Sequence, residues 1–118
     1  MILVPGTKLE ALLAGAVSAN QPVVTVDYVD WNPQGVMTNR AQFRVAMNNT
    51  TLVTILAAPV ANAVREVLRI NVYNVDTSSV TWTLNSDDGT TDIIEVKIAI
   101  ATLKTLQWMK YIGWLAAP

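Results

Sequence analysis

Cysteine and histidine are both absent from the 118 residues of this chain. Without cysteine there is no disulfide framework, no thiolate metal site and no thiol nucleophile. Without histidine the chain lacks the side chain that titrates nearest neutral pH and that most often binds metal ions. Triads built on a histidine base and ordinary zinc sites are therefore excluded. We predict a protein that is not an enzyme and that carries no cofactor.

Charged residues are also scarce, at 14% of the chain, against about 25% in an average soluble domain. Apolar residues reach 52%, and the mean hydropathy is +0.34. A monomer needs charged surface to stay dissolved. This composition therefore predicts a chain that covers part of its surface with further copies of itself or with another protein. The net charge of −1 offers no electrostatic footprint for nucleic acid.

Long apolar runs are missing as well. The longest, residues 11–17 and 55–61, are well short of the roughly 20 residues that a membrane helix requires. Residues 1–10 do not have the basic and apolar regions of a secretory signal. We expect no membrane association, and we expect one domain over residues 1–118 with a single core.

The chain is rich in alternation of apolar and polar residues. The clearest block is residues 64–100, where three alternating runs are separated by turns. Further strands are predicted over residues 22–31, 42–47, 51–57 and 104–111. Seven or eight strands at this spacing predict an all-β fold, a single antiparallel β-sandwich or jelly-roll-like domain.

Residues 8–17 have two interpretations. Thr7 and Glu10 match a helix capping box, and apolar residues recur here at helical spacing, which predicts a short helix. A strand over residues 8–13 is the alternative. The other signals in the chain are all β, and the family resemblance given below, in which the opening segment is extended, favours the strand.

Within residues 64–73 the alternation assigns the side chains to two faces. Glu66, Leu68, Ile70 and Val72 share one face, and Val67, Asn71 and Tyr73 share the other. Arg65 and Arg69 are predicted on the Val67 face. We interpret them as members of a solvated face, with pairing to Glu66 or Glu95 of neighbouring strands, or to another chain, as the alternative.

The carboxylates do not predict a site. Asp27 and Asp30 are three residues apart on a predicted strand, so they lie on opposite faces and cannot share a proton or a metal ion. Asp87, Asp88 and Asp92 surround a glycine turn, but their spacing does not match a calcium-binding loop. We interpret this group as hairpin chemistry, and we assign no catalytic, cofactor-binding or metal-binding residue.

Tryptophan is the most informative aromatic residue. Trp82 lies in an alternating run and is predicted in the core, whereas the other three lie at strand ends or near the C-terminus. Such aromatic residues often anchor subunit contacts. The predicted interface comprises Trp31, Trp108, Tyr111, Trp114 and Leu115. A sugar-binding platform would also need hydrogen-bonding side chains in a cleft beside the rings, and the sequence shows no such cluster next to the tryptophans.

The order of these motifs resembles that of small structural proteins of tailed bacteriophage virions. The segments that carry the resemblance are residues 52–59, 65–76, 80–84, 87–90 and 103–114. They correspond to a strand ending in Ala-Pro, an Arg-initiated strand ending in Asn-x-Asp, a Thr/Val strand, an acidic hairpin and a Tyr-x-Gly-Trp ending. The chain departs from the pattern at residues 99–102, where family members usually have a glycine turn.

The resemblance implies a virion component, assembled in the host cytoplasm. The expected role is a capsid decoration or cement protein that bridges capsid subunits. The expected assembly is a homo-oligomer, with a trimer as the best guess, and the expected partner is the major capsid protein or another virion protein. The alternative is a tail, baseplate or fibre component with a host-recognition role, for which residues 32–40 form the longest candidate loop. A carbohydrate-binding sandwich and a glycosidase with two facing carboxylates are further alternatives.

Overall fold

The computed structural model describes residues 1–116, and these residues form strands and turns without a helix. None of them forms a helix that could cross a membrane. Residues 117 and 118 of the predicted domain lie outside the described range. The strands are β1 (Ile2–Leu3), β2 (Lys8–Leu13), β3 (Val23–Trp31), β4 (Met37–Ala46), β5 (Val53–Leu56), β6 (Val64–Tyr73), β7 (Val80–Asp87), β8 (Asp92–Ile100), β9 (Thr105–Met109) and β10 (Gly113–Ala116). The predicted all-β fold is confirmed.

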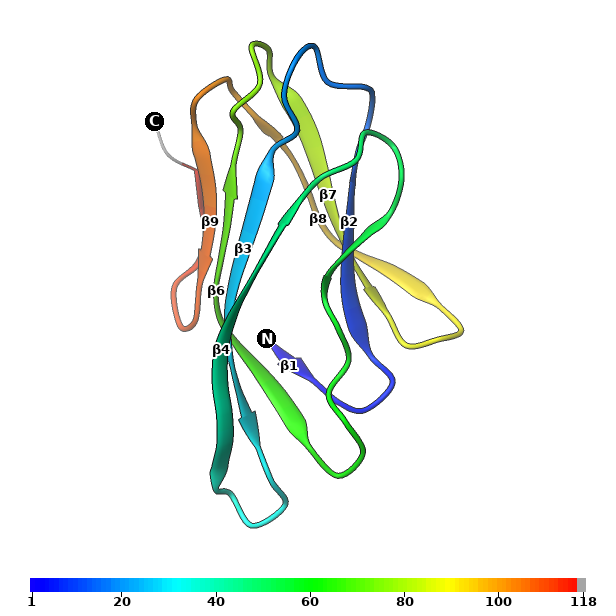
Figure 1. The fold of residues 1–118 in the computed structure, drawn as a ribbon, viewed down its shortest axis with the longest axis vertical. Helices are drawn as coiled ribbons and strands as arrows, with labels where there is room; N and C mark the ends of the chain where they lie inside the picture. Colours follow the sequence, from blue (N-terminus) through cyan, green and yellow to red (C-terminus); the bar gives the residue numbers. More distant parts are fainter. Residues whose placement is uncertain (117–118) are drawn as a thin grey trace.

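The strands form two antiparallel sheets that pack face to face. The first has the order β10-β9-β6-β3-β4, and β1 pairs with the part of β6 that lies beyond β9. The second has the order β5-β2-β7-β8. Figure 1 shows the β3–β4 and β7–β8 hairpins pointing away from each other at one end of the molecule, with β1 and the β5–β6 connection between them.

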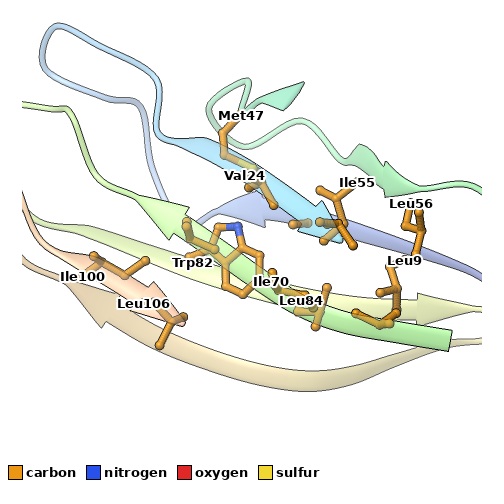
Figure 2. Packing of buried hydrophobic residues seen from close by; sticks show 14 of the residues in the cluster. Leu9, Val24, Met47, Ile55, Leu56, Ile70, Trp82, Leu84, Ile100 and Leu106 are labelled. Atoms are coloured by element: carbon orange, nitrogen blue, oxygen red, sulfur yellow. The ribbon is translucent and has the colours of Figure 1, made fainter. Parts of the chain in front are cut away.

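The core lies between the sheets and is built from the inward-facing half of each alternating strand. Figure 2 shows Trp82 in the middle of this cluster, with Ile100 and Leu106 toward one end and Leu9 and Leu56 toward the other. Trp82 is completely buried, which confirms its predicted position. Packing of this kind supplies the main driving force for the fold, because apolar surface leaves water when the two sheets meet.

Residues 8–13 form strand β2, so the strand interpretation of this segment is confirmed. The strand lies between β5 and β7 and pairs residue for residue with β7, from Lys8 opposite Asp87 to Leu13 opposite Trp82. Leu9, Ala11 and Leu13 are buried on one face, a period of two that also fits the sequence. The local capping-box preference is overridden by the tertiary contacts of this inward face.

The predicted faces of β6 are wrong over its first half. Asp27 pairs with Arg69 but Tyr28 pairs with Val67, so Leu68 is an extra residue that forms a β-bulge. The bulge shifts the alternation by one residue, and Val67 is therefore buried on the same side as Ile70. In consequence Arg65 faces the sandwich interior with Val67, whereas Arg69 lies on the outer face.

The predicted loop at residues 32–40 is shorter than expected, because β4 begins at Met37. The remaining turn is closed by the Asn32 side chain, whose Oδ1 accepts the backbone N–H groups of Gln34 at 3.0 Å and Val36 at 2.9 Å. Strand β4 is an edge strand that is largely exposed on both faces. Its first half therefore shows no apolar alternation, which explains why the sequence did not reveal it.

Candidate functional site

Asp30 and Arg65 form a buried ion pair at the end of the first sheet. They lie opposite each other on β3 and β6, and Arg65 Nε and Nη2 donate to the two Asp30 carboxylate oxygens at 2.8 and 3.0 Å. Nη1 donates to the Ala57 carbonyl at 2.8 Å, and the guanidinium lies 4.4 Å from the Tyr28 ring centroid. The hydrogen bonds from Arg65 lower the pKa of Asp30, and Asp30 raises the pKa of Arg65. This arrangement ties β3 and β6 of the first sheet to the segment that follows β5 of the second.

Asp27 is engaged in the same manner on the opposite face of β3. Its carboxylate accepts hydrogen bonds from Arg69 Nε at 3.0 Å and from Gln42 Nε2 at 2.7 Å. The prediction that Asp27 and Asp30 lie on opposite faces is confirmed. The prediction that Arg65 and Arg69 share a face is wrong, because the bulge at Leu68 separates them, and each pairs with its own aspartate.

Glu66 forms a third internal pair. Lys110 Nζ lies 2.8 Å from Glu66 Oε2, and Trp31 Nε1 donates to Oε1 at 3.3 Å. The bond from Lys110 lowers the pKa of Glu66, and Glu66 in turn raises the pKa of Lys110. Trp31, predicted as an interface residue, is thus half-buried and hydrogen-bonded within the chain.

The acidic hairpin between β7 and β8 has the hydrogen bonds of a tight turn. Asp88 Oδ1 accepts the backbone N–H groups of Thr90 and Thr91 at 2.9 and 2.8 Å, which lowers the pKa of Asp88. Asp87 Oδ1 accepts the Gly89 N–H at 2.7 Å, and Gly89 has a φ of +94° that favours glycine. These contacts agree with the interpretation of the hairpin as turn chemistry.

Beside this turn the structure adds a carboxylate that the sequence did not indicate. Oxygens of Glu10, Asp87 and Asp92 lie within 4.8 Å of one another, because β2 pairs with the end of β7. Lys8 Nζ lies 3.4 Å from Glu10 and 3.8 Å from Asp87. The lysine therefore supplies positive charge to this group of three carboxylates.

The loop between β6 and β7 is a buried polar hub that sequence reasoning read only as a turn. Asp76 is 1% exposed, and its carboxylate accepts the backbone N–H groups of Ser18 at 2.9 Å, Ala19 at 2.8 Å and Asn20 at 3.1 Å. These N–H groups, led by that of Ser18, hold the pKa of Asp76 far below its ordinary value. Asn74 Nδ2 donates to the carbonyls of Ser78 and Ile100 at 3.0 and 2.9 Å. The hub is structural, since every polar atom described here bonds within the chain.

The predicted interface residues divide into half-buried and exposed members. Trp108 and Trp114 are cross-strand partners that pack against the core, and the Trp114 ring meets Trp82 edge-on at 5.9 Å between centroids. Leu115 is exposed, and Tyr111 is 93% exposed at the turn between β9 and β10. Of the five predicted interface residues, these last two are the most exposed.

Tyr111 is also conformationally unusual. Its φ is +71°, in the left-handed region that non-glycine residues rarely adopt, and the next residue, Ile112, is exposed as well. Lys110 Nζ lies 4.7 Å from the centroid of the Tyr111 ring. The monomer thus places a large aromatic side chain at a strained and solvated position.

No protein-family model, curated protein or solved structure matches this chain.

Proposed function

We propose that this chain is a structural subunit of a bacteriophage virion, most simply a capsid decoration protein, and that the β9–β10 turn is a contact through which it assembles. The observation that carries the proposal is Tyr111, an almost fully exposed aromatic residue held in a left-handed backbone conformation. The expected assembly is a homo-oligomer, a trimer as the best guess, bound to the major capsid protein.

The energetics support an external partner for this turn. A left-handed conformation costs a non-glycine residue about 1–2 kcal/mol, and the exposed ring returns little of this in the monomer. Burial of a large side chain of this kind against a partner contributes about 1.5–3 kcal/mol. Ile112 and Leu115 lie near it in sequence and are also exposed. Burial of Tyr111 on assembly would therefore offset the free-energy cost of its left-handed conformation, a cost that glycine would not have.

The polar chemistry of the chain also fits a structural role. Four carboxylates each accept hydrogen bonds from groups within the chain, namely those of Asp27, Asp30, Glu66 and Asp76. These four carboxylates stabilise strands and loops, and they are not left facing one another in the manner that glycoside hydrolysis requires.

The experiment that tests the proposal is the substitution Tyr111→Gly. Glycine relieves the positive φ, so we expect the melting temperature to be unchanged or raised, while sedimentation velocity shows at least about tenfold weaker self-association. Co-sedimentation with capsids should decrease in parallel.

The matched control is Leu103→Gly. Leu103 is also exposed with a positive φ of +59°, but it precedes β9 and so lies at the opposite end of that strand. We expect it to leave association unchanged. Unchanged association in the Tyr111 variant, or equal loss in both variants, would contradict the proposal. Immunogold labelling of virions distinguishes the capsid from the tail location.

A further inference from the structure

A hollow of about 330 Å³ lies on the outer face of the first sheet. It is lined by Val23, Thr25, Arg44, Asn71, Tyr73 and Thr105. The strand register explains its shape. One cross-strand row runs from Arg44 through Thr25 to Asn71, and the next runs from Val23 through Tyr73 to Thr105. Thr25 and Val23 of β3 thus lie between Arg44 on β4 and Tyr73 on β6.

The polar groups of the hollow are not fully used by the chain itself. Arg44 forms no ion pair with residues 1–116, and its one side-chain hydrogen bond there is a long one of 3.4 Å from Nε to Thr25 Oγ1. Asn71 Oδ1 is buried beneath the hollow's surface and has no hydrogen-bond partner within the described chain. The Asn71 amide can therefore reorient toward a ligand without giving up a bond from that oxygen.

Tyr73 supplies an apolar surface beside these groups. Its side chain is 41% exposed at the rim of the hollow. An aromatic ring in this position can pack against the C–H face of a sugar ring, while the threonine hydroxyls and the Asn71 amide bond its hydroxyl groups. A sugar-binding site needs hydrogen-bonding side chains beside an aromatic ring, and the sequence showed none next to the tryptophans. In the folded chain such side chains, from four strands, lie around Tyr73 instead.

We propose that this hollow binds an acidic saccharide, a sugar that bears a carboxylate. Arg44 is the one charged residue among its lining residues, and its guanidinium matches a carboxylate in geometry and charge. The volume is at the lower end of the range for small-molecule sites, roughly 300–1,000 Å³, and so fits one sugar residue. This inference goes beyond the proposed assembly role and does not depend on it, because the site lies within one chain.

The test is a titration of the full chain with glucuronate, glucose and acetate, followed by amide chemical shifts in nuclear magnetic resonance spectra. We expect glucuronate to shift Thr25, Asn71 and Thr105 with a Kd on the order of 1 mM, as befits a small and open site. Glucose, which lacks the carboxylate, and acetate, which lacks the ring, should each bind at least about tenfold more weakly.

Two substitutions and one control assign the roles. Arg44→Gln should weaken glucuronate binding about tenfold or more and leave glucose unchanged, because only the charge-assisted bonds are lost. Tyr73→Ala should weaken both sugars. Arg40→Gln is the matched control, since Arg40 is also exposed on β4 and does not line the hollow.

Three results would overturn the proposal. Equal amide chemical-shift changes with acetate and glucuronate would show that the hollow recognises a carboxylate and not a sugar. Equal losses in the Arg44 and Arg40 variants would show a general effect of charge. The absence of shifts at about ten times the expected Kd would exclude the saccharide. None of these results bears on self-association through Tyr111, so failure of this inference and failure of the proposed function remain distinguishable.

Discussion

Replacing Asp30 with alanine removes the partner of a buried guanidinium. In the native chain Arg65 donates two bonds to Asp30, at 2.8 and 3.0 Å, and the side chains are only 13% and 11% exposed for Arg65 and Asp30 respectively. The variant leaves a positive charge at the edge of the core with the Ala57 carbonyl and the Tyr28 ring as its remaining contacts. The free energy of unfolding should therefore decrease.

The magnitude follows from the burial and from the contacts that remain. Removal of one member of a fully buried pair costs about 3–5 kcal/mol. Because this pair keeps slight exposure and Arg65 keeps two other contacts, we expect about 2–4 kcal/mol. At roughly 3–5 °C per kcal/mol for a chain of this length, the melting temperature should fall by about 10 °C.

Urea denaturation of four proteins tests this prediction: wild type, Asp30→Ala, Arg65→Met and the double variant. Methionine removes the charge but keeps apolar contact with Tyr28, so the double variant should recover at least about 1 kcal/mol of the loss in the Asp30 variant. Since the pKa of Asp30 is lowered in the folded state, the contribution of the pair is complete above the ordinary aspartate pKa and is lost as pH falls below it. A loss below about 1 kcal/mol, as measured for exposed pairs, would refute the reasoning.

Three further predictions concern single positions. Trp82 is fully buried, and its Nε1 has no hydrogen-bond partner within the described chain. Trp82→Phe should therefore change the free energy of unfolding, measured by urea denaturation, by less than about 1.5 kcal/mol. Trp82→Ala, which leaves a cavity, should lower it by about 3–5 kcal/mol. Asp76→Asn should lower the melting temperature at pH 7. Because the pKa of Asp76 is lowered in the folded state, the contribution of this carboxylate to wild-type stability is complete above the ordinary aspartate pKa and decreases as pH falls from there toward the lowered pKa. The difference in melting temperature between variant and wild type should narrow over that range, and a difference that is constant with pH would contradict this. Gly89→Ala should destabilise the chain by about 1 kcal/mol through its positive φ alone, since a Cβ there meets no atom within 4 Å.

The strands that the sequence predicted best are those that contribute alternate residues to the core. Strands β3 and β7 alternate clearly because one face of each must be buried between the sheets. The first half of β4 was missed because an exposed edge strand needs no apolar face. Strand β1 is two residues long and exists only through its pairing with β6, so no local pattern could indicate it.

The polar contacts were less predictable than the strands. The bulge at Leu68 exchanges the faces of Arg65 and Arg69, and a bulge is set by strand pairing that alternation does not record. The bonds from Ser18–Asn20 to Asp76 join segments more than fifty residues apart. The hollow around Tyr73 likewise exists only once four strands are in register. The resemblance to phage virion proteins stays a prediction.

The position of Tyr111 along the chain has a consequence for protein synthesis. Ribosomes make a chain from its N-terminus, and β2 must wait for β7, just as β3 must wait for β6, before either sheet can close. The β9–β10 turn emerges after all of these strands. The edges of β2, β3, β6 and β7 are therefore available to one another before the surface proposed for assembly is synthesised. If the β9–β10 turn is the assembly contact proposed above, it is therefore synthesised after these four strands.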